Sequence, residues 1–187
     1  MPRIAIVLAC TGLALLAACG GPQQRFAAPP APPGERIAIP VRFVQLREVS
    51  LPAYARDEEI WVEGEGGALT PQRNLLWADA PERGVTQELA RQLAAITGAT
   101  VAAEPWPFDS LPQATVELRL DTFLAGRDGR FRIAGQYFVA GRPALRDRSG
   151  TFEVAAAITP DSGVPGIVAA RAQAVRDLAR LIARDGF

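Results

Sequence analysis

The side chains in this sequence that could carry acid–base chemistry are carboxylates. The densest group is Asp57-Glu58-Glu59, with Glu63 and Glu65 close behind it. Two carboxylic acids are sufficient for the acid and base roles of a glycoside hydrolase. Charges of this kind beside a short run of β-branched and aromatic residues are also typical of a solvated turn entering a strand. We interpret the group as such a turn, and a carboxylate-dependent envelope hydrolase stays as a less favoured alternative.

The chain lacks the residues that the other common catalytic sites need. It has no histidine and no lysine. Ser-His and Cys-His pairs are therefore absent, and so is the commonest transition-metal ligand. No serine lies in a G-x-S-x-G turn; the four serines are Ser50, Ser110, Ser149 and Ser162. The sequence predicts a protein that is not an enzyme and that holds no metal and no cofactor.

The first residues have the pattern of an export signal. Arg3 is followed by a stretch from Ile4 to Ala18 that carries no charge. This stretch is shorter than the roughly 20 apolar residues that a membrane-spanning helix needs. A short positive start, a short apolar run and small residues at its end are typical of a cleaved secretory signal. We therefore predict a signal peptide over residues 1–18.

The signal ends at a cysteine, in Leu16-Ala17-Ala18-Cys19. This ending resembles the lipobox of bacterial lipoproteins, in which the cysteine after the cleavage site receives fatty acyl chains such as palmitate. The resemblance implies that Cys19 is a lipidation site. The alternative is an ordinary signal peptide in which the cysteine falls by chance. Cys10 would be lost with the signal, so no thiol would remain in the folded body.

A Pro-rich segment follows Cys19. Between Gly20 and Gly34 it contains no aliphatic residue larger than alanine and five prolines: Pro22, Pro29, Pro30, Pro32 and Pro33. Such a segment cannot supply a core and is expected to be extended. At about 3.1 Å per residue it would reach roughly 45 Å from a membrane. We predict a lipidated tether over residues 19–35 and one folded domain over residues 36–187.

Two segments have the apolar periodicity of amphipathic helices. In the first, over about 79–98, Asp79 is the expected N-cap, and Gln87, Glu88, Arg91 and Gln92 are expected to face water. Its expected apolar face consists of Val85, Leu89, Leu93 and Ile96. In the second, over about 164–184, an outer row of arginines is expected: Arg171, Arg176, Arg180 and Arg184. Its expected buried residues are Val168, Val175, Leu178 and Ile182.

Alternating apolar residues predict the strands. The expected ranges are 37–43, 59–63, 69–77, 151–158 and a hairpin of 116–124 with 131–139 around Asp128-Gly129. The order of strands and helices predicts an α/β fold, namely a two-layer sandwich of a mostly antiparallel sheet and two main amphipathic helices. The chain has a formal net charge of zero, so no bulk field favours nucleic acid as a partner.

The order of motifs along the chain resembles the PqiC-type family of ABC-type transport auxiliary lipoproteins. The residues that carry the resemblance are Leu51-Pro52-Ala53-Tyr54, Trp77 with Glu82, Pro105-Trp106-Pro107, and the strand from Val116 to Phe123. They follow the lipobox and the Pro-rich segment in the family's order. The resemblance covers the whole chain after the signal.

The resemblance implies a non-catalytic subunit of an envelope lipid-transport system. Such lipoproteins are anchored in the outer membrane, dock to a periplasm-spanning MCE-domain protein that works with an ABC transporter or permease, and can form rings. Gly20 fits this location, because aspartate after the cysteine usually retains a lipoprotein in the inner membrane. We expect Tyr54, Trp77 and Trp106 either to mark a partner surface or to pack in the core. A periplasmic lipid-binding shuttle is the alternative function.

Overall fold

The structure is a computed structural model that describes residues 22–29, 32, 34–142 and 145–187. The predicted signal peptide and Cys19 lie outside the described residues. The strands are β1 (Gln24–Phe26), β2 (Phe43–Leu46), β3 (Glu59–Glu63), β4 (Leu69–Trp77), β5 (Thr100–Ala103), β6 (Ala114–Ala125), β7 (Arg130–Gly141) and β8 (Arg148–Ala157). The helices are α2 (Pro81–Thr97), α3 (Gly163–Asp185) and two short 3₁₀ turns, η2 (Ala53–Ala55) and η3 (Glu65–Gly67).

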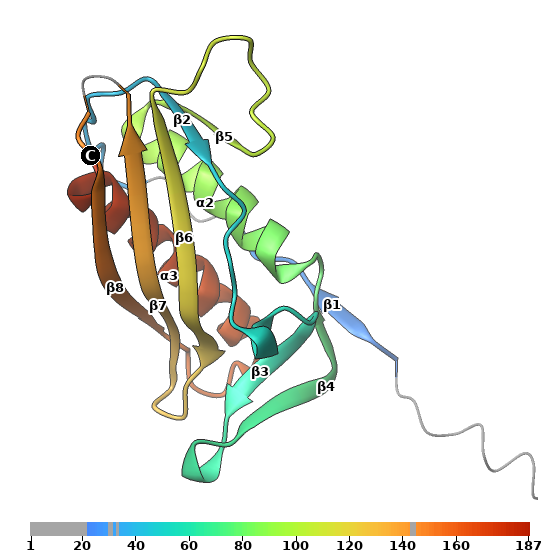
Figure 1. The fold of residues 1–187 in the computed structure, drawn as a ribbon. Helices are drawn as coiled ribbons and strands as arrows, with labels where there is room; N and C mark the ends of the chain where they lie inside the picture. Colours follow the sequence, from blue (N-terminus) through green and yellow to red (C-terminus); the bar gives the residue numbers. More distant parts are fainter. Residues whose placement is uncertain (1–21, 30–31, 33, 143–144) are drawn as a thin grey trace, which may run out of the picture.

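All the described strands belong to one sheet in which β6 is central (Figure 1). On one side β6 pairs with β7, which pairs with β8, both in antiparallel register. On the other side β6 pairs with β2 near its start and with β3 at its end. Beyond β2 lies β5, and beyond β3 lie β4 and then β1.

The description of the sheet as mostly antiparallel needs correction. Four strand pairs are parallel: β1–β4, β2–β5, β2–β6 and β3–β6. Three are antiparallel: β3–β4 and the long ladders β6–β7 and β7–β8. The three antiparallel pairs join consecutive strands through hairpins, whereas the parallel pairs join strands that longer connections bring together. The hairpins are visible in the sequence pattern, but the crossovers are not.

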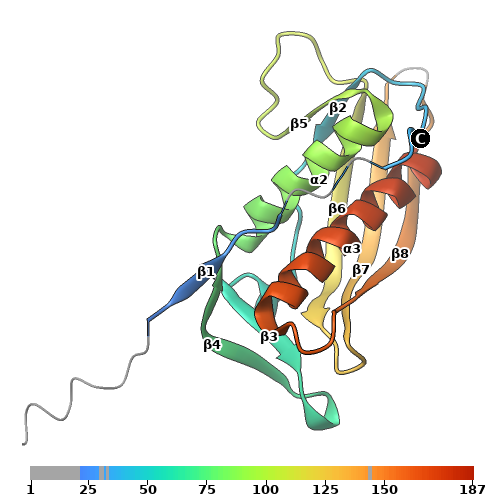
Figure 2. The ribbon, with the colours of Figure 1, turned by 180° about the vertical axis from the view of Figure 1, so that it is seen from behind.

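The two long helices lie side by side across one face of this sheet, and the two-layer α/β architecture is confirmed (Figure 2). The expected apolar faces of both helices are buried between the layers. The residues concerned are Val85, Leu89, Leu93, Ile96, Val168, Val175, Leu178 and Ile182. Gly98 ends α2 in the left-handed conformation (φ 73°), which a glycine adopts without steric cost. The prediction of Asp79 as the N-cap is wrong, because Ala80 holds that position. Among the described backbone groups, the Asp79 carboxylate accepts a hydrogen bond from the Ala80 N–H and from no N–H of the first helical turn.

The strand predictions hold for β3 and β4 and differ at the first strand. The segment from 37 to 42 is not a strand, and the Ile37 N–H donates to the carbonyl of Ile96 at the end of α2 (2.8 Å). The ladder begins only at Phe43, beyond Pro40, which has no N–H to donate to a ladder. The short strand β5 was not anticipated, because Thr100–Ala103 shows no alternation of apolar and polar residues.

A β-bulge in β6 changes which residues face the core. The register between β6 and β7 shifts between Leu120 and Thr122. Phe123 therefore lies on the core side and is 3% exposed, although strict alternation would place it on the outer face. Gly135 lies opposite this bulge, where an added Cβ would come within 2.2 Å of the Arg119 carbonyl oxygen. The bulge is thus matched to a residue without a side chain.

Part of the expected tether lies on the folded body. Strand β1 pairs in parallel with β4, and the Ala78 N–H donates to the Phe26 carbonyl (2.9 Å). Arg25 forms an ion pair with Glu58 (2.7 Å), and Arg176 on α3 donates to the Pro32 carbonyl (3.2 Å). Two residues lie between Cys19 and the described chain at position 22, so the three residue steps span at most roughly 11 Å of extended backbone. The reach from Cys19 is therefore much shorter than a free Pro-rich segment would give.

Candidate functional site

The two long helices are joined by a buried ion pair. Glu88 on α2 and Arg171 on α3 are 3% and 5% exposed. The Glu88 Oε2 atom lies 3.3 Å from Arg171 Nη2. Neither Glu88 oxygen nor Arg171 Nε has a hydrogen-bond partner among the described residues. The attraction between the two charges therefore offsets most of the free-energy cost of removing them from water.

Aromatic rings complete the surroundings of Arg171. Its guanidinium carbon lies 4.8 Å from the centre of the Trp77 ring and 5.8 Å from that of Phe123. Trp77 packs against Phe123 and Phe131, with ring centres 6.3 and 6.4 Å apart. A guanidinium over an aromatic face is attracted by the negative face of the ring. This contact ties α3 to the end of β4 and to the bulged part of β6.

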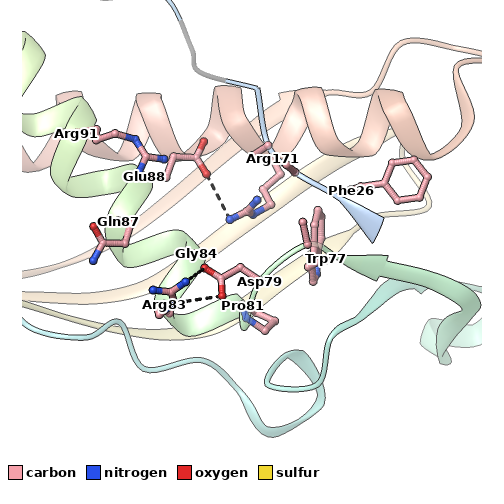
Figure 3. Close-up of a pocket in the computed structure, with 13 residues that line it drawn as sticks. Phe26, Trp77, Asp79, Pro81, Arg83, Gly84, Gln87, Glu88, Arg91 and Arg171 are labelled. Carbon is pink, nitrogen blue, oxygen red and sulfur yellow. Dashed lines mark hydrogen bonds and ion pairs between the residues drawn. The ribbon is translucent and has the colours of Figure 1, made fainter. Parts of the chain in front are cut away.

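A pocket of about 450 Å³ opens beside the ion pair, between β1, the end of β4 and the first turns of α2 (Figure 3). Asp79 and Arg83 form an ion pair at its edge, with Arg83 Nη2 3.0 Å from Asp79 Oδ2. The hydrogen bond from Arg83 holds the pKa of the Asp79 carboxyl below its ordinary value. The apolar part of the lining comes from Phe26, Trp77 and Pro81.

Burial dominates the electrostatics of the ion pair. It raises the pKa of the Glu88 carboxyl, against the opposing effect of the Arg171 and Arg91 charges. It lowers the pKa of Arg171, which the Glu88 carboxylate partly restores. A buried carboxyl with a raised pKa beside a pocket is the usual description of a general acid. Both Glu88 oxygens are shielded from solvent, however, so a substrate in the pocket has no access to them.

The sequence pattern placed both members of this pair on the wrong face. Glu88 was expected in water on the first helix and Arg171 in the outer arginine row of the second. Each helix is covered on two sides, by the sheet and by the other helix, and these two residues lie on the sides that meet (Figure 3). Arg184 is exposed as expected, while Arg176 and Arg180 are half-buried.

The acidic group at the start of β3 does not form an enclosed site. Asp57 is exposed, and Glu58 and Glu59 are half-buried. Glu58 is held by Arg25, and farther along Glu63 forms an ion pair with Arg132. Across the described ranges, no three His, Cys, Asp or Glu side chains gather where they could hold a metal ion. None of the helices in the described part of the chain combines the length and apolar character that a membrane span requires.

The three aromatic residues proposed for a partner surface lie in different surroundings. Trp77 is 5% exposed and belongs to the core, so the surface prediction is corrected for this residue; its large ring is buried under Arg171. Tyr54 is half-buried, and its hydroxyl oxygen accepts a hydrogen bond from the Phe123 N–H (2.9 Å). Its ring packs edge-on against Trp61, with centres 6.1 Å apart. Tyr54 thus fixes the backbone of the bulged part of β6.

Trp106 lies elsewhere, in the loop between β5 and β6, which spans residues 104–113. This loop also holds Phe108, 45% exposed, and Leu111, 71% exposed. Neither residue was singled out from the sequence. The signal was present as two large apolar side chains among prolines and polar residues, outside any periodic segment.

Comparisons with known proteins agree on the fold. The chain is similar to the crystal structure of an uncharacterized protein, with 18% identity and a TM-score of 0.72 over 89% of this chain and 100% of that one. It is similar to the crystal structure of a protein from Xanthomonas campestris, with 16% identity and a TM-score of 0.63 over 88% of this chain and 94% of the other. A PelC dodecamer from Paraburkholderia phytofirmans, at 12% identity and 87% and 95% coverage, has a TM-score of only 0.43 and carries no argument.

No curated protein matches the sequence. A family model described as the ABC-type transport auxiliary lipoprotein component matches residues 25–183. The match begins in β1 and ends in the last turn of α3, so it includes both helices and the complete sheet from Arg25 onward. The chain belongs to the ABC-type transport auxiliary lipoprotein family.

Proposed function

We propose that this protein is an outer-membrane lipoprotein subunit of an envelope lipid-transport system, anchored through acyl chains on Cys19. It acts without catalysis and without a cofactor, and it docks to a periplasm-spanning MCE-domain protein that works with a transporter or permease. The family match over residues 25–183 is the observation that carries this proposal. The cysteine at the end of a short apolar signal supports the anchor.

The site geometry supports a docking role over a chemical one. In the most polar buried group, the Glu88–Arg171 pair, both Glu88 oxygens are shielded from solvent, and the pair joins the helices. The pocket beside it has a strongly charged lining, which does not suit the acyl chains of a lipid. The charged residues are Asp79, Arg83, Glu88, Arg91 and Arg171. The proposed docking would use the outer surfaces of the domain, and a ring of copies would present such surfaces repeatedly.

The anchor and the docking role are tested together by substitution of Cys19. The lipidated chain and Cys19→Ser are produced in the native host, whose cells are separated into membrane and periplasmic fractions before purification, with Gln136→Ser on the outer face of β7 as the control. We expect the lipidated chain and the control to fractionate with the outer membrane and to co-purify with an MCE-domain subunit. The Cys19→Ser chain is expected folded in the soluble periplasmic fraction. Outer-membrane fractionation of Cys19→Ser would contradict the anchor, and absence of any MCE-domain or transporter subunit would contradict the docking role.

A further inference from the structure

The exposed apolar surface of this domain is concentrated in one loop. Within the residues that the structure describes, both large hydrophobic side chains that are exposed, Phe108 and Leu111, belong to the β5–β6 loop, residues 104–113. Trp106 in the same loop is half-buried. Soluble domains expose single apolar residues at many positions, whereas a local group of large ones marks an interaction site.

The loop is held in place by contacts of its own. Trp106 Nε1 donates to the Ser110 carbonyl (2.6 Å), and the Trp106 and Phe108 rings pack edge to face with centres 5.0 Å apart. Phe108 also packs against Phe43 at the start of β2, with ring centres 6.4 Å apart. These contacts hold the Trp106 and Phe108 rings in place before any partner binds, which lowers the entropy cost of association.

Both ends of the loop are attached to the sheet region. The Gln113 side-chain oxygen accepts from the Arg42 N–H (2.6 Å) and the Phe43 N–H (3.2 Å). At the other end, the Glu104 carboxylate accepts from the Glu48 N–H (2.9 Å). The loop therefore projects as an ordered element from the end of the sheet (Figure 1).

The charge of the loop favours a protein over a membrane. Residues 104–113 contain two carboxylates, Glu104 and Asp109, and no lysine or arginine. Surfaces that bind anionic lipid combine apolar residues with basic ones. The loop's own apolar side chains and two carboxylates instead fit a partner surface that has an apolar patch and basic residues around it.

The position of the loop relative to the chain that leads to Cys19 supports the same occupant. In both views the loop projects from one end of the molecule, while β1 lies apart from it, at the side of the molecule near the start of α2 (Figures 1 and 2). Cys19 lies within roughly 11 Å of extended backbone from position 22, just before β1. A lipid on Cys19 would therefore bring β1 close to the membrane, and the loop lies on a different part of the domain from β1.

We propose that the β5–β6 loop, through Phe108, Leu111 and Trp106, is the surface that docks a partner protein with an apolar patch and a basic rim. This inference rests on the proposed function, under which the MCE-domain subunit is that partner. The exposed pair Phe108 and Leu111 supplies the contact, and Trp106 holds the loop in its docking conformation.

The test compares the full lipidated chain in nanodiscs with two double variants. Phe108→Ser with Leu111→Ser removes the exposed apolar side chains from the loop. Gln136→Ser with Thr151→Ser changes two exposed, paired residues on the outer face of the sheet and is the matched control. We measure the dissociation constant for the purified MCE-domain subunit. The loop variant is expected to bind about tenfold more weakly or worse, and the control as the unchanged chain does.

The outcomes separate this inference from the proposed function. Equal binding by the loop variant and the unchanged chain would overturn the docking surface and leave the proposed function intact. No binding by the unchanged chain would overturn the proposed function and the partner assigned to the loop. Two further measurements test whether the loop binds a membrane or a second copy of the chain instead. Loop-dependent binding of the Cys19→Ser chain to phosphatidylethanolamine–phosphatidylglycerol vesicles, or a loop-dependent change in its oligomeric mass, would also overturn the proposal.

Discussion

The Glu88 carboxylate on α2 lies 3.3 Å from the Arg171 guanidinium on α3, and both side chains are almost fully buried. This pair joins the two helices at the place where they also meet the end of β4. A buried ion pair is weak evidence for stability by itself, because the cost of removing two charges from water offsets their attraction. The pair lies beside β4, the strand that pairs with β1.

Removal of one partner is expected to be more harmful than removal of both. Arg171→Met leaves the Glu88 carboxylate buried without its counter-charge, which typically costs about 3–5 kcal/mol of unfolding free energy. Glu88→Leu together with Arg171→Met is expected to recover most of that loss. Urea unfolding, with each change made in the Cys19→Ser chain, compares Arg171→Met, Glu88→Leu and the double variant. Additive losses, with the double variant less stable than Arg171→Met, would contradict the ion pair as the reason.

The stability contribution of Glu88 is expected to depend on pH. Burial raises the pKa of its carboxyl in the folded protein, whereas the unfolded chain has the ordinary value of about 4.3. The folded state thus binds this proton more tightly, and the stability from the protonated form is lost as pH rises through the folded pKa. We expect the unfolding free energy of the unchanged chain, relative to Glu88→Gln, to fall above about pH 4 and then to become constant.

Urea unfolding over about pH 4 to pH 8 checks this expectation, with Glu153→Gln on β8 as the control for the substitution itself, because Glu153 is exposed. A relative stability that rises with pH would show that the Arg171 charge outweighs burial at Glu88.

Two glycines are expected to respond in opposite ways to alanine. At Gly84 on α2 an added Cβ would meet Arg171 Nη2 at 3.6 Å, an ordinary contact. Gly84→Ala is therefore expected to stabilise the protein by up to about 1 kcal/mol through helix propensity. At Gly135 the Cβ would lie 2.2 Å from the Arg119 carbonyl oxygen, so Gly135→Ala is expected to cost about 1–3 kcal/mol. Thermal unfolding measures both variants. A stabilising effect of Gly135→Ala would contradict the conclusion that the bulge in β6 requires glycine at position 135.

The attachment of β1 is testable at a single amide. The Ala78 N–H donates to the Phe26 carbonyl, so its hydrogen exchange reports whether β1 is in place. Phe26→Ser removes the half-buried side chain of β1 from the core and is expected to speed exchange at Ala78 while leaving the helices protected. Gln24→Ser, at the exposed start of the strand, is the control. Unchanged exchange in Phe26→Ser would mean that backbone pairing alone holds β1.

Local patterns in the sequence predict the two long helices and most of the longer strands, but they do not predict which polar residues are buried between the helices. The limits of β3 and β4 and the inner face of α2 follow from alternation and helical periodicity, because each has a single apolar side facing one layer. Glu88 and Arg171 were assigned to solvent because a periodic pattern treats every polar residue as an outer one. Only the packing of α3 against α2 makes a second covered side, and a long-range charge pair leaves no mark in a local pattern.

The pairing of β1 and the bulge in β6 could not be predicted from local patterns for a related reason. β1 is three residues long and lies among prolines and alanines, so its pairing with β4 depends on an edge that the rest of the fold creates. The bulge in β6 adds one residue to the strand and so places Phe123 on the core side. A prediction from strict alternation of inward and outward residues does not allow for such an extra residue. Phe108 and Leu111 are visible in the sequence as large apolar residues outside any periodic segment. Their exposure to solvent follows only from where the fold places the loop.

Cross-linking in the native envelope tests the account most directly. A photoreactive amino acid replaces Phe108 in the lipidated chain, and the same replacement at Arg127, exposed in the turn between β6 and β7, is the control. We expect a cross-link from position 108 to an MCE-domain subunit and none from position 127. Recovery of no MCE-domain or transporter subunit from position 108, or of the same subunit equally from both positions, would contradict an anchored domain that docks its partner through the β5–β6 loop.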